Sequence, residues 1–573
     1  MNILSANLSN HHSGFCTFSP FSKMFTFLST QQTKFFYQIK KKQMLRVFLI
    51  IQQKTNISRS RKRKERIRVF MNFTNLLENK LNFTETENGA VALKSTKSGL
   101  LDAFGKLGAM RTNEETEIIK TFNLAFAEDK ELAMKLLFYI RDIRGGQGER
   151  RVFRVIMNYL AKNKPEVVVK NLDNFAFYGR YDDLLCLLDT PVERDVLGLI
   201  KDTLDADVKS VANGGVPSLM AKWLPSVNGV KNTRKVALKI VNGLNMSERD
   251  YRKTLSKLRK ALDIVETKLC EKRYEDIDFS KLPSKAQMLY RELFMKHAEE
   301  RYIEYLKQLS EGNAKINAGA LFPVDIVGKI LREWSVSLAN RYLYDAMWKN
   351  LPNWFEGKEE TGLCVVDVSG SMCGVPMEVA ISLGLYCADK CNGVFKNSFI
   401  TFSEYPELVK VQGEDIVDKV HNMQNADWGM NTDFNKVLQL ILDTAIKNNC
   451  SQSDLPNKLY VISDMQFDYA TGSGNTIHRD WAKKFAEHGY EMPAIVYWNV
   501  RTSHCGMFQE DKNGTNVAMV GGYSPVLFKN VIDGTQYEET VNEKGEKVVK
   551  QQIDPMNVML TTLQNERYDR VVA

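Results

Sequence analysis

Three side chains with oxygen donors stand at alternate positions in the stretch TGLCVVDVSGSM, which spans residues 361–372. They are Asp367, Ser369 and Ser371, and they follow a mostly apolar run over residues 362–367. Such a run is typical of a parallel strand that is buried on both faces. Open α/β sheets place their binding sites at the carboxyl ends of such strands. The pattern therefore predicts three hard oxygen ligands where a strand gives way to a Gly turn.

Two more oxygen donors follow in later loops. Thr432 lies in the stretch GMNTDF, and Asp464 directly follows a second apolar run over residues 459–463. Carboxylate and hydroxyl oxygens suit Mg²⁺, which prefers octahedral oxygen coordination and takes one or two carboxylates. The alternative is that the hydroxyl-rich turn only caps the helix that follows it.

The Asp-x-Ser-x-Ser pattern, with Thr432 and Asp464 in this order, resembles the metal-ion-dependent adhesion site of von Willebrand factor A (vWA) domains. The resemblance implies that Ser369 and Ser371 bind Mg²⁺, or another divalent cation, directly. Asp367, Thr432 and Asp464 would bind directly or through water. One coordination position would stay open for a carboxylate supplied by a protein partner.

The residues around this site do not indicate catalysis. A catalytic metal needs a base beside it, and none of the seven His residues lies in these loops. The P-loop signature, a catalytic triad and an H-E-x-x-H motif are all missing from the sequence. We therefore predict a binding or structural site and no enzymatic activity.

The elements that must position these side chains begin near residue 353. Apolar strands alternate with amphipathic helices from there on, which predicts a doubly wound α/β sheet with helices on both faces. The expected strands cover residues 362–367, 398–403, 408–411, 458–463, 493–498 and 516–520. The expected helices cover residues 375–390, 415–423, 434–447 and 476–487. One or two final helices are interrupted by a hairpin-like insertion around residues 542–547.

The preceding part, residues 103–349, has apolar residues at the three and four spacing of helices. After a polar lead-in over residues 71–100, we expect helices over residues 113–126, 130–142, 151–161, 165–174 and 180–188. Longer helices are expected over residues 251–272 and 286–309. Helices separated by short polar connectors are typical of an α-solenoid.

Three phrases in the helical part carry a second resemblance: FYIRDIRGGQGER at residues 138–150, YGRYDD at 178–183 and AKWLPS at 221–226. With the α/β half, they resemble a family of domains of unknown function found in plants, microbes and viruses. Its layout is similar to that of the TROVE module of the Ro ribonucleoprotein, in which a ring of HEAT-like helical repeats is closed by a vWA (Rossmann-like) domain. The resemblance covers residues 75–573. It implies a helical-repeat domain at 71–352, a vWA-like domain at 353–573, and binding of a small structured RNA.

Basic side chains in the helical part are the candidates for RNA contact. Arg141, Arg144, Arg150 and Arg151 lie in or next to the Gly-rich phrase at residues 138–150. Arg180 lies in the phrase YGRYDD, and Lys222 lies in AKWLPS. Those on the expected helix 251–272 are Lys253, Lys257, Arg259 and Lys260. Arg forks match phosphate geometry. The alternatives are ion pairs with nearby acids inside the repeat stack, and a solvated helix face.

The net charge of +9 is unevenly distributed along the 573 residues. Residues 1–70 hold 14 basic and 1 acidic side chains, residues 71–350 hold 45 and 38, and residues 351–573 hold 19 and 30. The helical part is therefore mildly basic, and the acidic C-terminal part will not bind nucleic acid by bulk charge. No apolar run reaches the roughly 20 residues of a membrane span, and nine Cys residues without a C-x-x-C pair favour free thiols in a reducing, cytoplasmic setting.

Residues 1–70 are compositionally unlike the rest, with a basic run over residues 59–68. Three interpretations stay open. The segment is upstream sequence translated from a misplaced start, with Met71 as the true initiator; or it is an organelle transit peptide; or it is a disordered basic arm for nucleic acid.

Two functions follow from these observations. The first is a non-catalytic ribonucleoprotein component whose helical part contacts RNA and whose α/β part carries a Mg²⁺ site for a protein contact. The alternative is a protein-interaction scaffold that uses the Mg²⁺ site without RNA.

Overall fold

The computed structural model describes residues 81–358, 361–425, 432–469, 474–502, 507–541 and 547–573. Residues 82–573 form one compact unit. The basic extension over residues 1–70 lies outside the described residues. Among those that are described, no helix is both long enough and apolar enough to span a bilayer, and the seven cysteines are free thiols.

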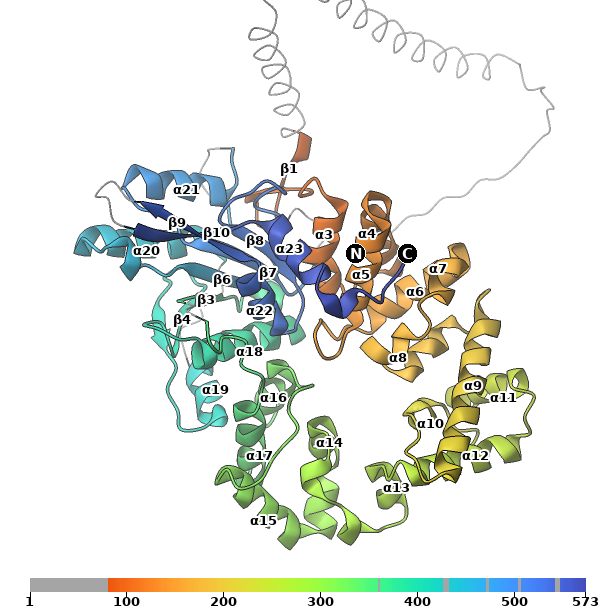
Figure 1. The fold of residues 1–573 in the computed structure, drawn as a ribbon. Helices are drawn as coiled ribbons and strands as arrows, with labels where there is room; N and C mark the ends of the chain where they lie inside the picture. The colour runs from red at the N-terminus through yellow and green to blue at the C-terminus, as the bar shows by residue number, and fades with distance from the viewer. Residues whose placement is uncertain (1–80, 359–360, 426–431, 470–473, 503–506, 542–546) are drawn as a thin grey trace, which may run out of the picture. The chain divides into compact units, whose positions relative to one another are not determined.

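The C-terminal part is built on a sheet of six strands, five of them parallel (Figure 1). In chain order the strands are β3 (Leu363–Val366), β4 (Ser398–Thr401), β5 (Leu408–Lys410), β6 (Lys458–Ser463), β7 (Ala494–Asn499) and β8 (Val517–Gly521). Their order across the sheet is β5-β4-β3-β6-β7-β8, and only β5 runs antiparallel to its neighbour. Every residue of β3, β6 and β7 is buried, as the continuous apolar runs predict.

Helices cover both faces of this sheet. They are α18 (Val375–Lys390), α19 (Ile416–Gln424), α20 (Phe434–Asn448), α21 (Ile477–Glu487), α22 (Val526–Asp533) and α23 (Pro555–Leu563). On one face, Trp498 of β7 packs against Phe528 of α22, which also stacks on Tyr386 of α18. On the other face, Tyr497 contacts Phe434 of α20. The alternation of facing aromatic residues along β7 thus determines which helices cover each side.

A β-hairpin interrupts the C-terminal helices, as predicted. Its strands are β9 (Thr535–Val541) and β10 (Lys547–Ile553), which pair antiparallel from Thr535 opposite Ile553. The tip at residues 542–546 lies outside the described residues.

The N-terminal part is helical from residue 99 onward. Its helices are α3 (Gly99–Lys106), α4 (Glu115–Glu128), α5 (Lys130–Arg141), α6 (Arg151–Asn163), α7 (Pro165–Val169), α8 (Asn174–Tyr178), α9 (Glu193–Ala212), α10 (Met220–Trp223), α11 (Lys231–Gly243), α12 (Glu248–Ala261), α13 (Val265–Cys270), α14 (Ser284–His297), α15 (Glu299–Ser310), α16 (Pro323–Ile330) and α17 (Leu338–Lys349). The fold is therefore a mixed α and α/β architecture, with a helical N-terminal part and a mostly parallel sheet in the C-terminal part.

Four helix predictions were wrong in detail. The expected helix 165–174 is the short α7 and the start of α8, with a turn over residues 170–173 between them. The expected helix 251–272 is two helices, because Asp263 takes a left-handed conformation (φ 48°) that ends α12 before α13. The expected helix 286–309 is also two helices, since Ala298 leaves the helical region (φ −146°, ψ 38°). Residues 181–187 form a 3-10 helix instead of the expected α-helix over 180–188. The apolar periodicity continues across such short breaks and does not reveal them.

The lead-in before residue 99 also differs from the prediction. It contains a hairpin of β1 (Phe83–Glu85) and β2 (Val91–Leu93), which pair antiparallel. The hairpin packs on the α/β part: the Leu93 amide donates to the Phe508 carbonyl at 2.7 Å. A segment that precedes the helical part thus belongs structurally to the sheet domain.

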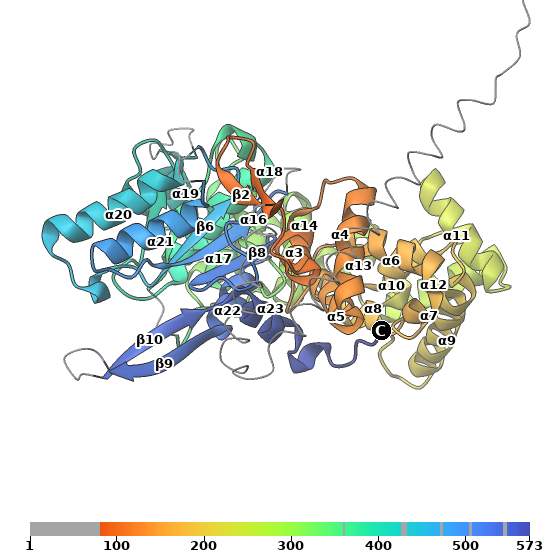
Figure 2. The same cartoon turned by 90° about the horizontal axis from the view of Figure 1, so that it is seen from above.

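The helical part contacts the α/β part at both of its ends. Helix α3 packs on β8, and Gly108, in the 3-10 turn over residues 107–109 that follows α3, approaches the backbone of Gly521. At the other end, α16 packs on α18 and α17 on α19, and Arg341 pairs with Asp415 at 2.8 Å. The helical chain therefore leaves the sheet domain and returns to it. Figure 2 shows the same arrangement of helices from above.

Candidate functional site

The carboxyl ends of β3 and β6 bring two predicted acids together. Asp367 follows β3 and is fully buried, and Asp464 follows β6 and is 3 % exposed. The Ser463 hydroxyl donates to Asp367 Oδ2 at 2.5 Å, and the Ser369 amide donates to Asp367 Oδ1 at 2.8 Å. The two strands are parallel neighbours, so their ends, and the side chains that follow them, meet at one edge of the sheet.

The two predicted serines complete this cluster. The Ser369 and Ser371 hydroxyls lie 3.1 Å apart, and the Ser371 side chain hydrogen-bonds the Asp464 carboxylate. Four of the five predicted metal ligands are therefore gathered at one point of the sheet edge, on two loops.

Thr432 has other partners. Its hydroxyl donates to Asp468 Oδ1 at 2.7 Å, and its amide donates to Asp468 Oδ2 at 3.0 Å. The hydroxyl also accepts from Asn88 Nδ2 at 3.0 Å. Gln466 links Thr432 to the cluster. The Gln466 carbonyl lies 3.0 Å from the Thr432 hydroxyl, and the Gln466 backbone amide donates to Asp464 Oδ1 at 3.2 Å. Thr432 therefore does not join the four gathered side chains directly. Gln466 lies between them and contacts both.

The electrostatics of the cluster favour a cation. Burial and the neighbouring Asp464 carboxylate raise the pKa of Asp367 to about 7. Burial also raises the pKa of Asp464, although a hydrogen bond from Ser371 and the charge of Arg501 oppose that shift. Two buried carboxylates this close repel each other, and a divalent cation between them would remove that cost.

The donor set also matches the chemistry of a hard cation. It consists of two carboxylates and two hydroxyls, which are oxygen ligands of the kind that Mg²⁺ takes while keeping several waters. Within the described ranges, no three His, Cys, Asp or Glu side chains gather as a metal cluster. A cation at this edge would therefore depend on the serine hydroxyls as well as on Asp367 and Asp464.

Sequence reasoning missed two contributors to this edge. Asn88, at the tip of the N-terminal hairpin, donates to Thr432 and also to the Gln466 carbonyl at 2.8 Å. Arg501, two residues after the end of β7, donates to the Ser371 carbonyl. No local pattern marks Asn88, because its partner is 344 residues away in the sequence. Arg501 comes soon after a buried parallel strand, β7. Because such strands end at the same edge of the sheet, its position in the sequence could have marked it as a candidate site residue.

A second feature is a groove of about 1290 Å³ in the helical part, between α10, α12, α13 and α14. The basic residues that line it are Arg180, Lys222, Arg249, Arg252, Lys253, Arg259, Lys260 and Lys285. Only two acids, Glu266 and Glu271, line it as well. Five of the predicted RNA contacts, Arg180, Lys222, Lys253, Arg259 and Lys260, therefore share one cavity, although they come from three separate segments of the chain.

Two side chains in this groove hold its walls together. Arg259 donates to the carbonyls of Ala221 and Leu224, at 2.8 and 2.7 Å, and to the Ser226 hydroxyl at 2.8 Å. The Arg180 guanidinium lies over the Trp223 ring, 4.5 Å from its centroid. The segment AKWLPS, residues 221–226, therefore forms a wall of the groove, and hydrogen bonds from Arg259 of α12 hold it in place. Lys253 and Lys260 are exposed instead and remain accessible to a ligand.

The other predicted RNA contacts lie outside the groove lining. Arg141 is 1 % exposed and pairs with Asp183 at 2.7 Å, so its prediction as an RNA contact was wrong and the intramolecular ion pair is correct. Arg144 donates to the Phe177 carbonyl at 3.0 Å, and Arg151 donates to the Asn113 carbonyl at 2.8 Å. Arg150 is partly exposed, and Lys257 is exposed on α12.

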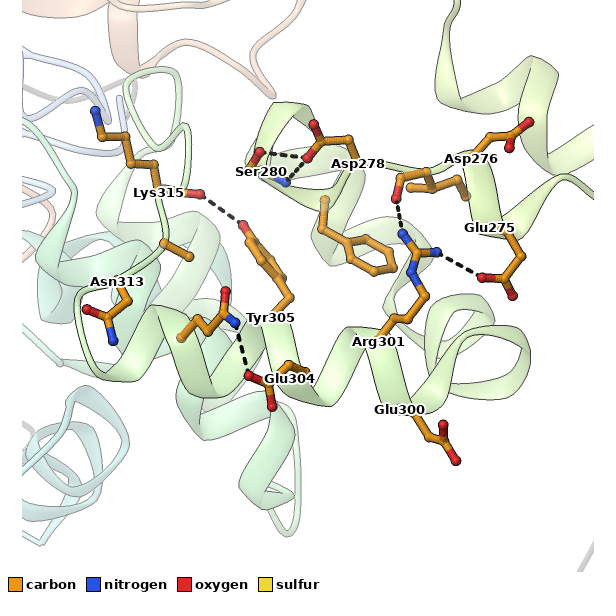
Figure 3. Close-up of a pocket in the computed structure, with 14 residues that line it drawn as sticks. Glu275, Asp276, Asp278, Ser280, Glu300, Arg301, Glu304, Tyr305, Asn313 and Lys315 are labelled. Carbon is orange, nitrogen blue, oxygen red and sulfur yellow. Dashed lines mark hydrogen bonds and ion pairs between the residues drawn. The ribbon is translucent and has the colours of Figure 1, made fainter.

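A third feature has the opposite charge. A pocket of about 930 Å³ beside α15 is lined by Glu275, Asp276, Asp278, Glu300 and Glu304, with Arg301 and Lys315 as its basic members (Figure 3). Arg301 is used internally, since its guanidinium donates to the carbonyls of Tyr274 and Ile277 at 3.1 and 2.9 Å. The Tyr305 hydroxyl donates to the Lys315 carbonyl at 3.0 Å. Glu275, Asp276 and Asp278 pair with Arg301, Arg273 and Lys281. Glu300 and Glu304 therefore give the pocket most of its remaining negative charge.

Comparison with known proteins follows the same division of the chain. Residues 86–198 and 241–353 match a domain of unknown function (DUF2828), and residues 361–563 match a second domain of unknown function (DUF7788). The chain is also 32 % identical over 496 residues to L728, an uncharacterized protein of Acanthamoeba polyphaga mimivirus. That alignment covers 80 % of this chain and 86 % of L728. The chain therefore belongs to the same protein family as mimivirus L728.

Proposed function

We propose that the protein is a non-catalytic RNA-binding component of a ribonucleoprotein. The helical part contacts RNA through the basic groove, and the α/β part carries a Mg²⁺ site that contacts a protein partner. In this proposal the helical part is a HEAT-like, TROVE-like module and the sheet part is a doubly wound, vWA-like domain.

The observation that carries this proposal is the charge of the groove. Eight basic side chains against two acids line one cavity of about 1290 Å³, and phosphate groups are the ligands that such a lining attracts. Trp223 and Tyr290, which are partly exposed, also line the groove, and aromatic rings beside basic side chains suit unpaired bases. The groove is therefore matched to both the backbone and the bases of a loop or single strand.

The Mg²⁺ site would be held by Asp367, Ser369, Ser371 and Asp464. The cation would supply a Lewis-acidic binding position for an oxygen ligand of a partner. The residues of this chain orient that position: Ser463 and the Ser369 amide hold Asp367, and Gln466 holds Asp464.

RNA binding is tested with the full-length protein, by filter retention over a series of salt concentrations. We expect the triple variant Lys222→Ala, Lys253→Ala, Lys260→Ala to bind a structured RNA at least about tenfold more weakly. The slope of log K against log salt should fall by roughly 2 to 3, because each phosphate contact contributes about one unit. Lys257→Ala, an exposed lysine of α12 outside the groove lining, is the matched control and should bind like the wild type. Binding by the wild type that is absent, or that does not depend on salt, would contradict the proposal.

A protein-interaction scaffold is the second candidate, and the acidic pocket beside α15 favours it. Five carboxylates line that pocket, which suits a basic protein segment. Affinity purification after nuclease treatment, with and without a chelator, separates the two functions. Partners that remain bound after nuclease treatment but leave with the chelator would support the scaffold.

A further inference from the structure

Two of the phrases in the helical part, FYIRDIRGGQGER and YGRYDD, meet at a buried carboxylate that fixes the backbone of Arg180. Asp183 is fully buried and accepts from the Arg180 amide at 2.9 Å and from Arg141 Nε at 2.8 Å. A Cβ on Gly179 would collide with the same carboxylate, so no larger residue fits beside Arg180. The main chain of Arg180 is therefore held by a buried ion pair of the helical part.

The Arg180 side chain is held by the third phrase, AKWLPS. Its guanidinium lies over the Trp223 ring, 4.5 Å from the ring centroid. Arg259 fixes the backbone on either side of Trp223 through two carbonyls. A guanidinium that stacks on an aromatic face keeps its N–H groups free at the edge of its plane. Both ends of Arg180 are thus positioned before any ligand binds.

Arg180 differs from the basic residues around it because it has no anionic partner. Arg141 pairs with Asp183 at 2.7 Å, and Lys222 pairs with Glu266 at 3.5 Å. Within the part of the chain that the structure describes, the Arg180 guanidinium donates no hydrogen bond and forms no ion pair. The side chain is nevertheless only partly exposed, and it lines the basic groove. A partly buried charge without a partner is costly, and an anion would remove that cost.

The electrostatics around Arg180 agree with this geometry. Burial, followed by the charge of Arg150, lowers the pKa of Arg180, although the nearby Asp182 opposes that shift. A guanidinium stays charged at neutral pH in spite of such a shift, so the repulsion between the two arginines persists in the folded protein. A negatively charged ligand between them would stabilise both.

We infer that the Arg180 guanidinium binds a phosphate of the RNA in the basic groove, and that Trp223 is its positioning residue. This inference rests on the proposed RNA binding. The fork of a guanidinium matches two phosphate oxygens, whereas the exposed Lys253 and Lys260 of the same groove offer point charges. Because Trp223 already holds the guanidinium, Arg180 loses little side-chain entropy when it binds. Its contact should therefore contribute more affinity than that of an exposed lysine.

The test measures binding of a structured RNA to the full-length protein by filter retention over a series of salt concentrations. Arg180→Ala should weaken binding at least about tenfold and lower the slope of log K against log salt by about one unit. Arg180→Lys keeps the charge but loses the fork, so we expect the wild-type slope with about tenfold weaker binding. Lys253→Ala removes one exposed charge from the same groove. This matched control should lower the slope equally but weaken binding less. Wild-type affinity of Arg180→Lys would overturn the inference.

Inorganic polyphosphate, which has phosphates but no bases, separates a phosphate contact from a base contact. Arg180→Ala should weaken binding of fluorescently labelled polyphosphate and of RNA by the same factor. A loss for RNA alone would assign Arg180 to a base and would overturn the inference. A wild type without salt-dependent RNA binding would refute the proposed function itself. Wild-type RNA binding by both Arg180 variants would refute only the role of Arg180.

The positioning role of Trp223 is tested by combining variants. Trp223→Leu should weaken RNA binding of the wild type but add little to Arg180→Ala, because the ring acts through the guanidinium. Trp223→Phe keeps a ring face and should retain most of the affinity. Trp334→Leu, which changes an exposed tryptophan outside the groove lining, is the matched control and should bind like the wild type. Equal losses from Trp223→Leu with and without Arg180 would overturn the positioning role.

Thermal melting without RNA separates binding from folding. Arg180→Lys should melt close to the wild type, since its main-chain bond to Asp183 stays in place. A clearly lower melting temperature of Arg180→Lys would assign Arg180 to holding the fold and would overturn the inference.

Discussion

At the scale of single residues, burial gives ordinary side chains unusual titration. At the candidate site, desolvation and the neighbouring Asp464 carboxylate together raise the pKa of Asp367. His478 shows it away from the site. It is 4 % exposed at the start of α21, and its Nδ1 lies 3.3 Å from the Tyr497 hydroxyl. Burial lowers the pKa of His478 to about 4, although Glu510 opposes the shift and Arg479 adds to it.

This depressed pKa predicts that His478, taken by itself, costs the protein stability in mild acid, whereas the raised pKa of Asp367 acts in the opposite direction. The unfolded chain binds a proton at His478 below its ordinary pKa of about 6.5, whereas the folded chain does so only near 4. The stability is fully present above pH 6.5 and declines as the pH falls from 6.5 toward 4. Between pH 7 and pH 5 this one residue should cost roughly 2 kcal/mol. Urea unfolding at both pH values should show a smaller loss for His478→Gln than for the wild type, and equal losses would contradict the assignment.

At the scale of elements, backbone contact decides where α3 and the 3-10 turn that follows it, over residues 107–109, meet the sheet. A Cβ on Gly108 would lie 2.2 Å from the Gly521 carbonyl oxygen, and a Cβ on Gly521 would lie 2.2 Å from the Gly105 carbonyl oxygen. The start of the helical part therefore rests on β8 without intervening side chains. This close approach fixes one of the two ends at which the helical part contacts the sheet domain.

Gly108→Ala should consequently destabilise the protein by more than about 2 kcal/mol, since backbone must shift to admit the methyl group. Gly198→Ala in α9 is the matched control. Apart from the neighbouring backbone of α9 itself, a Cβ at that position would meet no atom within 4 Å, and alanine favours a helix by up to about 1 kcal/mol over glycine. Chemical denaturation measures both variants, and similar midpoints for the two would contradict the close approach.

At the scale of the whole described unit, the C-terminal segment connects the two parts of the chain. In Figure 1 the last residues run beside α5 and α8. Arg567 donates through two guanidinium nitrogens to Asp142, and the Tyr568 hydroxyl donates to the same carboxylate at 3.1 Å. The Tyr178 hydroxyl donates to the Arg567 carbonyl at 2.5 Å. Asp142 is fully buried, so its charge depends on these partners.

Arg567→Ala should leave the Asp142 carboxylate buried without its guanidinium, which costs about 3 to 5 kcal/mol. We expect a lower melting temperature and faster hydrogen exchange in α5 and α8. Glu566→Ala, which changes an exposed neighbour, should leave both unchanged. If the two variants melted alike, the C-terminal segment would not be a clamp between the two parts.

Local patterns in the sequence were enough to identify the strands of the six-stranded sheet and much of the candidate site. Continuous apolar runs report burial on both faces, so β3 and β6 were predicted within one or two residues. Parallel strands end at the same edge, and this brought Asp367, Ser369, Ser371 and Asp464 together as expected. Helical periodicity likewise located α4, α5 and α6, because it depends only on neighbours within two turns.

Only the tertiary structure decided which polar groups have partners far away in the sequence. The local pattern does not show that Arg141 pairs with Asp183, and no local pattern marks Asn88. The hairpin reaches the sheet edge because the helical part between them leaves the sheet and comes back. Hydrophobic patterns record how much each residue is buried, but they do not record which distant segment buries it. The chemistry of this sheet edge depends on which distant segments meet there.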